Sequence, residues 1–434
     1  MLKNEEELRN EKNVKLLSLL LSLCIMMTCF AACGNSSGQS TPADSDKNAS
    51  AKQTGSANKI TLFQQKAEIA EQLQQMAKAY TAETGVEVEV WAQAGDEYYT
   101  NLKTSLSSES GPTVFTLNSD SEINEVKDYL ADLGKLSFLG NIEESLLAVR
   151  DGKTVGIPMT VEGFGLVYNG TLVDISKMTG TDALVSMIAE NSANGIDTLG
   201  LSQEDYFLAG HMLNFPFALQ DDPKAFCQKV YSGEVKLADV PEFQQYAQIL
   251  SAIREHQTNP IEVTYDTNCG DFATSKTAMI HQGNWAYGVM SAYDPKFDMG
   301  ITGLPINGNS KICVGVASVW CVNADATAEE QKLAMDFLTW LYTSETGTHY
   351  MMDEFGFIPV VDGMESKSLD PLSTAVAEAV AEGNILPWTF NTEWPAGIIS
   401  TDLAPITQEF FTSSMTGTEY LEALNAAFVA AAGA

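Results

Sequence analysis

The chain has 434 residues, 45% of them hydrophobic, so it can bury more than one core and we expect two or three domains. Acidic residues outnumber basic residues 57 to 24, which gives a formal net charge of -33. A surface of this charge repels nucleic-acid backbones and anionic lipid headgroups, so we exclude nucleic acid as a partner.

The N-terminal segment has the pattern of a secretion signal. Residues 16–30 form an apolar run that follows Lys12 and Lys15, with the length of a signal-peptide core and too short to span a membrane. The next residues, Ala31-Ala32-Cys33, resemble a bacterial lipobox, in which the cysteine is lipidated. We therefore predict a lipoprotein signal peptide over residues 1–32 and a lipid anchor on Cys33.

The segment that follows Cys33 has the composition of a linker. Residues 34–58 include no aromatic and no large aliphatic side chain, so they cannot bury enough apolar surface to fold. We predict that the lipidated Cys33 and a flexible linker occupy residues 33–58. The folded part then begins at Lys59, at the extracytoplasmic face of the cell membrane.

Strands and helices alternate along the first part of the folded region. Apolar residues recur at helical spacing from Ile69 to Tyr80, and valines alternate with glutamates in 86–90. The pattern predicts strands at 59–63, 86–91 and 113–117, and helices through 69–80, 102–106 and 123–130. This β-α-β-α-β-α order is typical of a wound parallel sheet.

In such a sheet, ligands bind beyond the carboxyl ends of the strands. Three loops lie at these positions, and they are rich in hydrogen-bonding side chains. They contain Gln64, Gln65 and Lys66; Gln93, Asp96 and Glu97; and Asn118, Ser119 and Asp120.

The remainder of the chain continues in the same style. Thr327-Ala328-Glu329-Glu330 is a capping box that opens a helix. Further strands are predicted at 155–159, 164–168, 277–281 and 314–322, and further helices at 181–191, 241–255, 372–380 and 420–428.

Several of these stretches, taken in order, resemble the extracellular solute-binding protein family 1, the maltose-binding-protein type. The most recognisable are 80–90 (YTAETGVEVEV), 154–169 (TVGIPMTVEGFGLVYN) and 276–285 (KTAMIHQGNW). The resemblance covers essentially everything after Lys59. It implies an extracytoplasmic receptor, expected to be a monomer, that captures a carbohydrate, most simply an oligosaccharide, and delivers it to the permease subunits of an ABC transporter.

The resemblance also implies an α/β, two-lobed, periplasmic-binding-protein-like fold of type II. Each lobe would be a wound sheet flanked by helices, with ligand bound in the cleft between them. We place lobe 1 at 59–160 plus 304–358 and lobe 2 at 161–303 plus 359–434. The hinge would consist of strands that cross near 159–163, 302–305 and 357–360.

Candidate ligand-binding residues follow from the resemblance and from the three loops. Glu162 matches a hinge acid that hydrogen-bonds sugar, and Trp285 matches a tryptophan that stacks on a pyranose face. Either Trp388 or Trp394 would be a second cleft tryptophan, and the sequence does not decide between them. The full set of candidates is Gln65, Asp96, Asn118, Asp120, Glu162, Asn284, Trp285, Trp388 and Trp394.

Two other classes of function remain open at this stage. A glycosidase would need two carboxylates, but acidic residues are too common here for a pair to be informative. A binding protein for a non-sugar solute, such as a peptide or a cation complex, would share the fold. No cysteine or histidine spacing suits a metal, so we expect neither metal nor cofactor, and a Cys313–Cys321 disulfide is left undecided.

Overall fold

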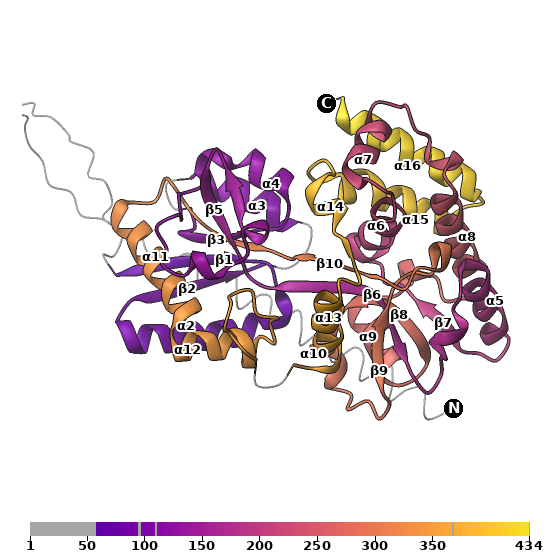
Figure 1. Cartoon of the computed structure of the whole chain (residues 1–434), viewed down its shortest axis with the longest axis horizontal. Coiled ribbons are helices and arrows are strands. Elements are labelled where there is room, and N and C mark those ends of the chain that lie inside the picture. The colour runs from indigo at the N-terminus through magenta and orange to yellow at the C-terminus, as the bar shows by residue number, and fades with distance from the viewer. Residues whose placement is uncertain (1–57, 94–96, 109–110, 367–368, 434) are drawn as a thin grey trace, which may run out of the picture. The chain divides into compact units, whose positions relative to one another are not determined.

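The computed structural model describes residues 58–93, 97–108, 111–366 and 369–433 (Figure 1). The predicted signal peptide, the linker up to residue 57, Cys33 and Asp96 lie outside the described residues. Among the residues that are described, no helix combines the length and the apolar character that a membrane crossing requires.

The first sheet has six strands in the order β2-β1-β3-β11-β5-β4. Its central strand β1 runs parallel to β2 and β3, as the β-α-β rhythm predicts, whereas β11 is antiparallel to both β3 and β5. The strands are β1 (Lys59–Gln64), β2 (Glu87–Ala92), β3 (Val114–Leu117), β4 (Ala148–Arg150), β5 (Lys153–Pro158) and β11 (Val319–Val322).

Helices cover both faces of this first sheet. Ile60, Leu62 and Val114 pack on one face with α2 and α11, whereas Phe63 and Phe115 pack on the other face with α3 and α4. Figure 1 shows α2, α11 and α12 together on one side of the strands. The helices are α2 (Ala70–Thr84), α3 (Glu97–Leu106), α4 (Asp120–Glu125), α11 (Ala328–Thr343) and α12 (Glu345–His349).

The second sheet is built around the long strand β6 (Val161–Asn169). The strand order is β12-β10-β6-β8-β7, and β9 continues beside β6 beyond the end of β10. Its other strands are β7 (Asp197–Gly200), β8 (Thr277–Gly283), β9 (Met299–Thr302), β10 (Ile312–Val316) and β12 (Ile385–Pro387).

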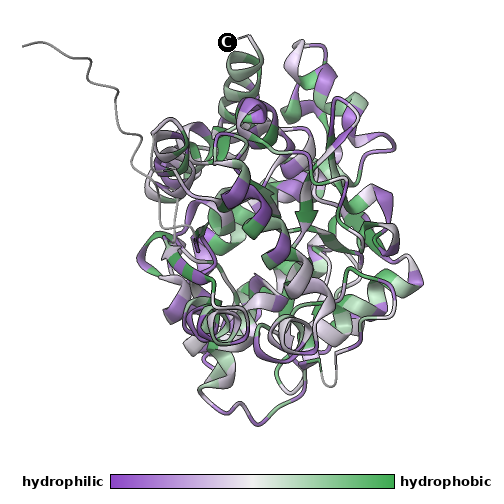
Figure 2. Cartoon of the chain, turned by 90° about the vertical axis from the view of Figure 1, so that its left-hand side faces the viewer, coloured by the Kyte–Doolittle hydropathy of each residue, from purple (hydrophilic) through white to green (hydrophobic). Residues whose placement is uncertain are grey.

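The helices of the second lobe form a larger core on one face of its sheet, around Phe164 and Leu166, and a smaller core on the other face, around Val167 and Ile280. The second-lobe helices are α5 (Thr181–Ser192), α6 (His211–Ala218), α7 (Pro223–Tyr231), α8 (Pro241–His256), α9 (Tyr265–Ala273), α10 (Tyr287–Ser291), α13 (Pro371–Glu382), α14 (Thr389–Thr392), α15 (Ala404–Thr412) and α16 (Gly417–Ala432). Figure 2 views the molecule from the first-lobe side, and the helices nearest the viewer carry both hydrophobic and hydrophilic residues, as expected when one face of a helix packs on a sheet.

Short helical turns complete the structure. Those that matter below are the 3-10 helices η1 (Ala67–Ile69) and η9 (Asn284–Ala286) and the π-helices η6 (Tyr206–Gly210), η11 (Tyr350–Glu354) and η12 (Ile399–Leu403). None of the π-helices is foreseen from sequence, and the helices α6, α7 and α15 are also missed.

The chain passes between the two sheets at three places, and two of these crossings differ from the prediction. The first crossing lies between Pro158 and Val161, as predicted. The second lies between Val316 and Val319 rather than at 302–305, because β10 pairs with β6 in the second sheet. The predicted single strand at 314–322 is therefore two strands, β10 and β11, in different sheets.

The segment that leads to the third crossing packs beside the first crossing. Thr160 Oγ1 accepts a hydrogen bond from the Ile358 backbone N–H at 3.0 Å, and Val161 forms an isolated β-bridge with Ile358. Val361 still pairs with Ile142 in the first lobe, so the chain leaves that lobe later than the predicted 357–360. Residues 304–316 and 359–361 thus belong to the opposite lobe from the one predicted.

Candidate functional site

The loop after β1 is held rigidly and directs a lysine toward the second sheet. The fully buried Gln64 brackets the backbone of Lys66: its Oε1 accepts from Lys66 N at 2.5 Å, and its Nε2 donates to Lys66 O at 3.1 Å. A side chain that satisfies both polar backbone groups of one residue fixes the direction of that residue. Sequence analysis places Lys66 in this loop but assigns it no role.

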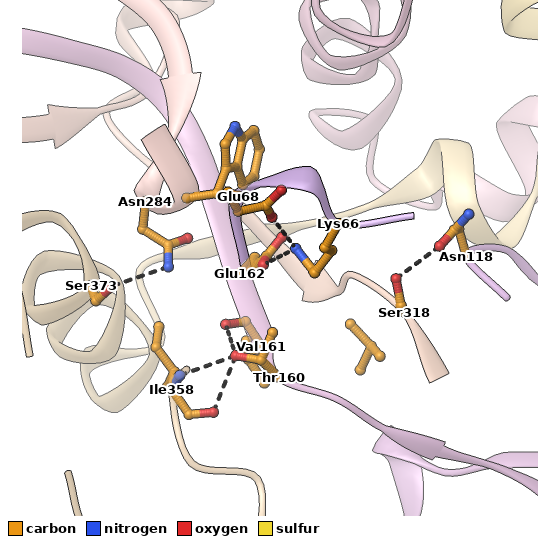
Figure 3. Close-up of polar contacts among 12 residues, drawn as sticks. Lys66, Glu68, Asn118, Thr160, Val161, Glu162, Asn284, Ser318, Ile358 and Ser373 are labelled. Carbon is orange, nitrogen blue, oxygen red and sulfur yellow. Dashed lines mark hydrogen bonds and ion pairs between the residues drawn. The ribbon is translucent and has the colours of Figure 1, made fainter. Parts of the chain in front are cut away.

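Lys66 forms an ion pair that joins the two sheets (Figure 3). Its Nζ lies 2.5 Å from Glu162 Oε1 on β6 and 3.0 Å from Glu68 Oε1 in η1. The side chains of Lys66 and Glu162 are only 10% and 7% exposed. We call Lys66, Glu162 and Glu68 the ionic triad; with one cation and two carboxylates it carries a net charge of about -1.

Burial and mutual attraction compete in this triad. Burial lowers the pKa of the Lys66 ammonium, but Glu162 and Glu68 outweigh it, and the net pKa is raised. Burial raises the pKa of Glu162 despite the attraction of Lys66. A buried carboxylate of this kind depends on its partner to stay charged, so removal of Lys66 would leave Glu162 with an unfavourable charge.

Two tryptophans lie over glycines on the sheet face that carries Glu162. Gly315 of β10 pairs with Glu162, and Gly283 of β8 pairs with Phe164, two residues along β6. Paired residues, and residues two apart on a strand, point to the same face of a sheet. This face therefore presents Glu162 and Phe164 between two positions that lack side chains.

The tryptophans occupy the space that the missing side chains leave. A Cβ on Gly283 would lie 2.2 Å from the Trp285 ring, and a Cβ on Gly315 would lie 2.6 Å from Trp388 Cγ. The centroids of Trp285 and Trp388 are 6.5 Å apart, with the ring planes at 85°. Both glycines are thus required for the two rings to lie where they do.

Further aromatic side chains surround this pair. The His211 ring stacks on Phe164 at 4.3 Å and lies 5.5 Å from Trp285. Phe207, in the π-helix η6, stacks on Trp285 with centroids 6.0 Å apart, and Tyr265 lies 5.3 Å from Phe207. π-Helical turns widen a helix locally and are frequent at functional sites.

The two histidines near this cluster are neutral. Burial, followed by the charge of His281, holds the pKa of His211 well below its ordinary value of 6.5. Burial lowers the pKa of His281 to about 3, although its Nδ1 lies 3.0 Å from the Gly165 carbonyl oxygen. They offer hydrogen bonds, not positive charge, at neutral pH.

Several buried polar atoms in this region have no hydrogen-bond partner among the described residues. They are His211 Nδ1, Gln282 Nε2, Trp388 Nε1 and Thr389 Oγ1. Gln282 does use its other end, because Trp285 Nε1 donates to Gln282 Oε1 at 3.1 Å. Unpaired buried polar atoms are costly, and their concentration beside an aromatic cluster is typical of a ligand-binding site.

The predicted residues of the first lobe are engaged in hydrogen bonds and ion pairs. Asn118 Oδ1 accepts from Ser318 Oγ at 2.8 Å, which ties the loop after β3 to the second crossing (Figure 3). Asp120 pairs with Arg150 at 2.7 Å. Gln65 is partly buried between Gln64 and Lys66.

The predicted residues of the second lobe differ in accessibility. Asn284 is buried; its Oδ1 accepts from Gly163 N at 3.0 Å and its Nδ2 donates to Ser373 Oγ at 3.1 Å. Trp285 is partly exposed, whereas Trp388 and Trp394 are 6% and 2% exposed. Trp388 borders Trp285, but Trp394 packs among Phe217 and Phe428 in the core.

A cavity of about 650 Å³ lies elsewhere on the first lobe. It is bordered by α12, η11 and residues 361–365, and none of the predicted site residues lines it. We place the functional site at the ionic triad and the tryptophans, because opposed donors, acceptors and aromatic faces converge there. Cys313 and Cys321, left undecided by sequence, are free and buried.

The chain forms two sheets flanked by helices and crosses between them three times. Polar and aromatic side chains meet beside those crossings. This arrangement is that of a two-lobed solute-binding protein. Residues 75–379 match the family described as bacterial extracellular solute-binding protein. The match spans more than half of the chain, so this protein belongs to that family, and the predicted resemblance is confirmed. The family consists of binding proteins that act outside the cytoplasm.

Solved structures share the fold at low sequence identity. RafE, known from Streptococcus pneumoniae, in complex with raffinose is 19% identical with a TM-score of 0.72, covering 86% of this chain and 99% of that one. A sugar transporter from Bacillus licheniformis in complex with stachyose is 15% identical with a TM-score of 0.69, covering 85% and 98%.

A third match is the maltose/maltodextrin-binding domain MalE from Bdellovibrio bacteriovorus bound to maltotriose, which is 18% identical with a TM-score of 0.66 and covers 85% of this chain and 98% of that one. No curated protein matches the chain. The solved structures confirm the predicted α/β, two-lobed fold class.

Proposed function

We propose that this protein captures an oligosaccharide in a cleft between its two lobes and delivers it, unchanged, to the permease of an ABC importer. The observation that carries the proposal is the ion pair between Lys66 of the first lobe and Glu162 of the second. Glu162 lies on the sheet face over which Trp285 and Trp388 pack. A ligand held there contacts both lobes at once, which is what a closure equilibrium requires.

The ionic triad suits the hydroxyl groups of a sugar. Two of the three N–H donors of Lys66 are used by Glu162 and Glu68, so one is left for a ligand. Glu162 contributes a second carboxylate oxygen beside it. Since a hydroxyl both donates and accepts, a charged donor next to a charged acceptor binds it with two strong hydrogen bonds.

The tryptophans suit the apolar faces of a sugar. Trp285 is partly exposed and held in place by Gly283, Gln282 and Phe207, so its ring would be a rigid stacking surface. We assign the second stacking role to Trp388, because it borders Trp285 and Trp394 does not. The unpaired Gln282 Nε2 and Thr389 Oγ1 would take further hydroxyl groups.

The solved relatives support the same ligand class. They were solved with raffinose, stachyose and maltotriose, all neutral oligosaccharides, and another similar structure is that of a chitin oligosaccharide binding protein. We infer from this that a saccharide of about three units is the first ligand to try. No pair of carboxylates in the triad is free to act as acid and nucleophile, because Lys66 is bonded to both, which favours binding without turnover.

The test is a thermal-shift and calorimetry screen of the full-length protein against neutral and charged oligosaccharides, amino acids and peptides. A ligand that binds only the folded state raises the melting temperature, and chromatography of the same mixtures shows whether it is cut. We expect one saccharide class to bind without new products. Binding of peptides alone, or cleavage of the saccharide, would contradict the proposal.

We also propose that Cys33 carries the lipid that anchors the protein outside the cell membrane. Multiple acyl chains on one cysteine hold a protein firmly at a bilayer. Cys33→Ser should abolish the incorporation of labelled fatty acid and release the protein from membranes, whereas Cys29→Ser, inside the apolar run, should change neither. Equal labelling of both variants would disprove the anchor.

A further inference from the structure

A row of three aromatic side chains lies on the second lobe, and the charge of Glu68 in the ionic triad acts on one end of it. Tyr265 of α9, Phe207 of η6 and Trp285 of η9 follow one another with centroids 5.3 Å and 6.0 Å apart. All three are partly exposed, whereas most aromatic residues in the larger core of the second lobe are buried. We call them the aromatic row. The three residues come from three separate elements, so a local stretch of sequence cannot reveal that they lie together.

Negative charge surrounds this row. Glu204 Oε1 accepts a hydrogen bond from the Tyr265 backbone N–H at 2.8 Å, and Asp266 is the next residue in the chain. Burial is the main cause of the raised pKa of Tyr265, but the charges of Glu68 and Asp266 add to it, so both carboxylates act on the aromatic row. The cation on the opposing loop, Lys66, is already matched by two carboxylates.

One of these carboxylates also has an oxygen without a partner. Glu204 Oε2 is buried and makes no hydrogen bond to the described residues. A buried carboxylate oxygen of this kind is expensive unless a donor or a cation meets it. Two more buried oxygens, Ser202 Oγ and Asn268 Oδ1, are also without a partner among the described residues, so unmet acceptors lie on the same segments as Glu204 and Tyr265.

Aromatic faces flanked by carboxylates attract ammonium groups. The negative face of each ring and the charge of the acids act in the same direction, most strongly where water is partly excluded. A neutral hydroxyl can donate a hydrogen bond to a carboxylate, but it gains less from the surplus negative charge than an ammonium group does. The triad supplies that surplus, and Glu68 is its most exposed carboxylate.

We infer that the aromatic row together with Glu68 binds a protonated amino group, so that the ligand of this protein is an oligosaccharide that contains amino sugars with free amines. This inference rests on the proposed function and narrows it. The relatives named above were solved with neutral saccharides, so the selectivity would distinguish this chain from them.

The experiment compares three trisaccharides of one linkage that differ only at carbon 2: glucosamine, N-acetylglucosamine and glucose units. Calorimetry of the full-length protein at about pH 6, below the pKa of a free amine, measures each Kd. We expect the amine form to bind about tenfold more tightly than either neutral form. The preference should weaken as salt is added, because exposed charges are screened.

Two variants locate the effect. Glu68→Gln should remove the preference for the amine over the neutral forms, and Glu71→Gln, an exposed acid one turn along the chain, should leave that preference intact. Phe207→Leu keeps an apolar side chain but removes the ring, and should also weaken the preference. A melting curve of each variant checks that it folds.

The outcomes separate the inference from the proposed function. Equal or tighter binding of the neutral forms, or a preference that survives Glu68→Gln, overturns the amino-sugar inference and leaves carbohydrate binding standing. Failure of the three trisaccharides while raffinose or maltotriose binds does the same. Failure of every saccharide overturns both.

Discussion

The loops at the carboxyl ends of β1 and β3 and the face of the second sheet contribute different side chains to the candidate site. The first lobe contributes charges and amides on rigid loops, chiefly Lys66, Glu68 and Asn118. The second lobe contributes flat rings set over glycines, chiefly Trp285 and Trp388, together with the charged Glu162. The aromatic rings bury apolar area, and the charged groups set direction.

This difference suggests a division of labour. Stacking on Trp285 does not depend on the other lobe, so the second lobe can hold a ligand alone. The charged loop can add its hydrogen bonds only when the first lobe lies close to the second, so these hydrogen bonds would stabilise the closed, ligand-bound state. Changes in the second lobe should therefore reduce affinity, whereas changes in the first lobe should alter stability and closure.

The largest expected effect is on the second lobe. Trp285→Ala should weaken saccharide binding by about 3 kcal/mol, on the order of a hundredfold in Kd, because a central stacking ring is lost. Trp285→Phe should retain part of the affinity, since a flat ring remains. Tyr293→Ala, which removes a 50% exposed ring of the same lobe, serves as the control in calorimetry and should bind normally. Normal binding by Trp285→Ala would refute the division of labour.

Two buried groups, one in each lobe, should also respond to pH in opposite directions. Burial raises the pKa of Glu122, in the first lobe, to about 7 from an ordinary 4.5, against the hydrogen bonds from Asn118 and Ser119. The folded state then binds a proton that the unfolded state has lost, so stability falls by about 3 kcal/mol as pH rises from about 4.5 to 7. His281, with its lowered pKa, has the reverse effect: stability falls as pH drops below its ordinary 6.5.

Urea unfolding across this pH range tests the contrast. Glu122→Gln should flatten the loss of stability toward neutral pH and leave the loss toward acid. Glu125→Gln is the matched control, because its pKa is lowered, first by Lys103, and its charged form is favoured in the folded state. If Glu122→Gln and the unchanged protein gave parallel curves, Glu122 would not be the titrating group.

Breaking the link between the lobes should cost a comparable amount of stability. Lys66→Met leaves Glu162 buried without its cation, and we expect a loss of about 3 kcal/mol in the free energy of unfolding. Lys59→Met removes a comparably short but more exposed ion pair with Glu89 of the neighbouring strand β2, and should cost well under 1 kcal/mol. Similar losses in the two variants would mean that the triad is an ordinary surface pair.

Sequence patterns predict where the helices and strands of this fold lie better than they predict which strands pair with one another. Helices with clear periodicity, such as 241–255, are found within a residue or two as α8 (Pro241–His256). The run 314–322 reads as one strand because β-branched residues continue through it, yet the chain changes sheets at Ala317 and Ser318. Local propensity contains no information about which sheet a strand joins, so the second hinge crossing was misplaced.

The site shows the same limit. Glu162 and Trp285 are identified by the family resemblance, and the structure places them on one sheet face. Phe207 and Tyr265 carry no local signal, because a π-helix and a helix start bring them together only after folding. Trp388 and Trp394 are six residues apart with similar neighbours in sequence, and only the packing of each ring tells the one beside Trp285 from the one in the core.

The smallest expected effect tests the glycine beneath Trp285. Gly283→Ala places a methyl group 2.2 Å from the ring, so the indole must move; we expect a loss of about 1–2 kcal/mol in stability and a comparable loss in saccharide affinity. Gly288→Ala, in α10 with no atom within 4 Å of its new methyl group, should be neutral or slightly stabilising. Tryptophan fluorescence adds an independent signal, because only Gly283→Ala should shift the emission of the ligand-free protein. If affinity fell without any spectral change, the methyl group would be blocking the ligand directly, and the role of Gly283 in setting the ring would have to be given up.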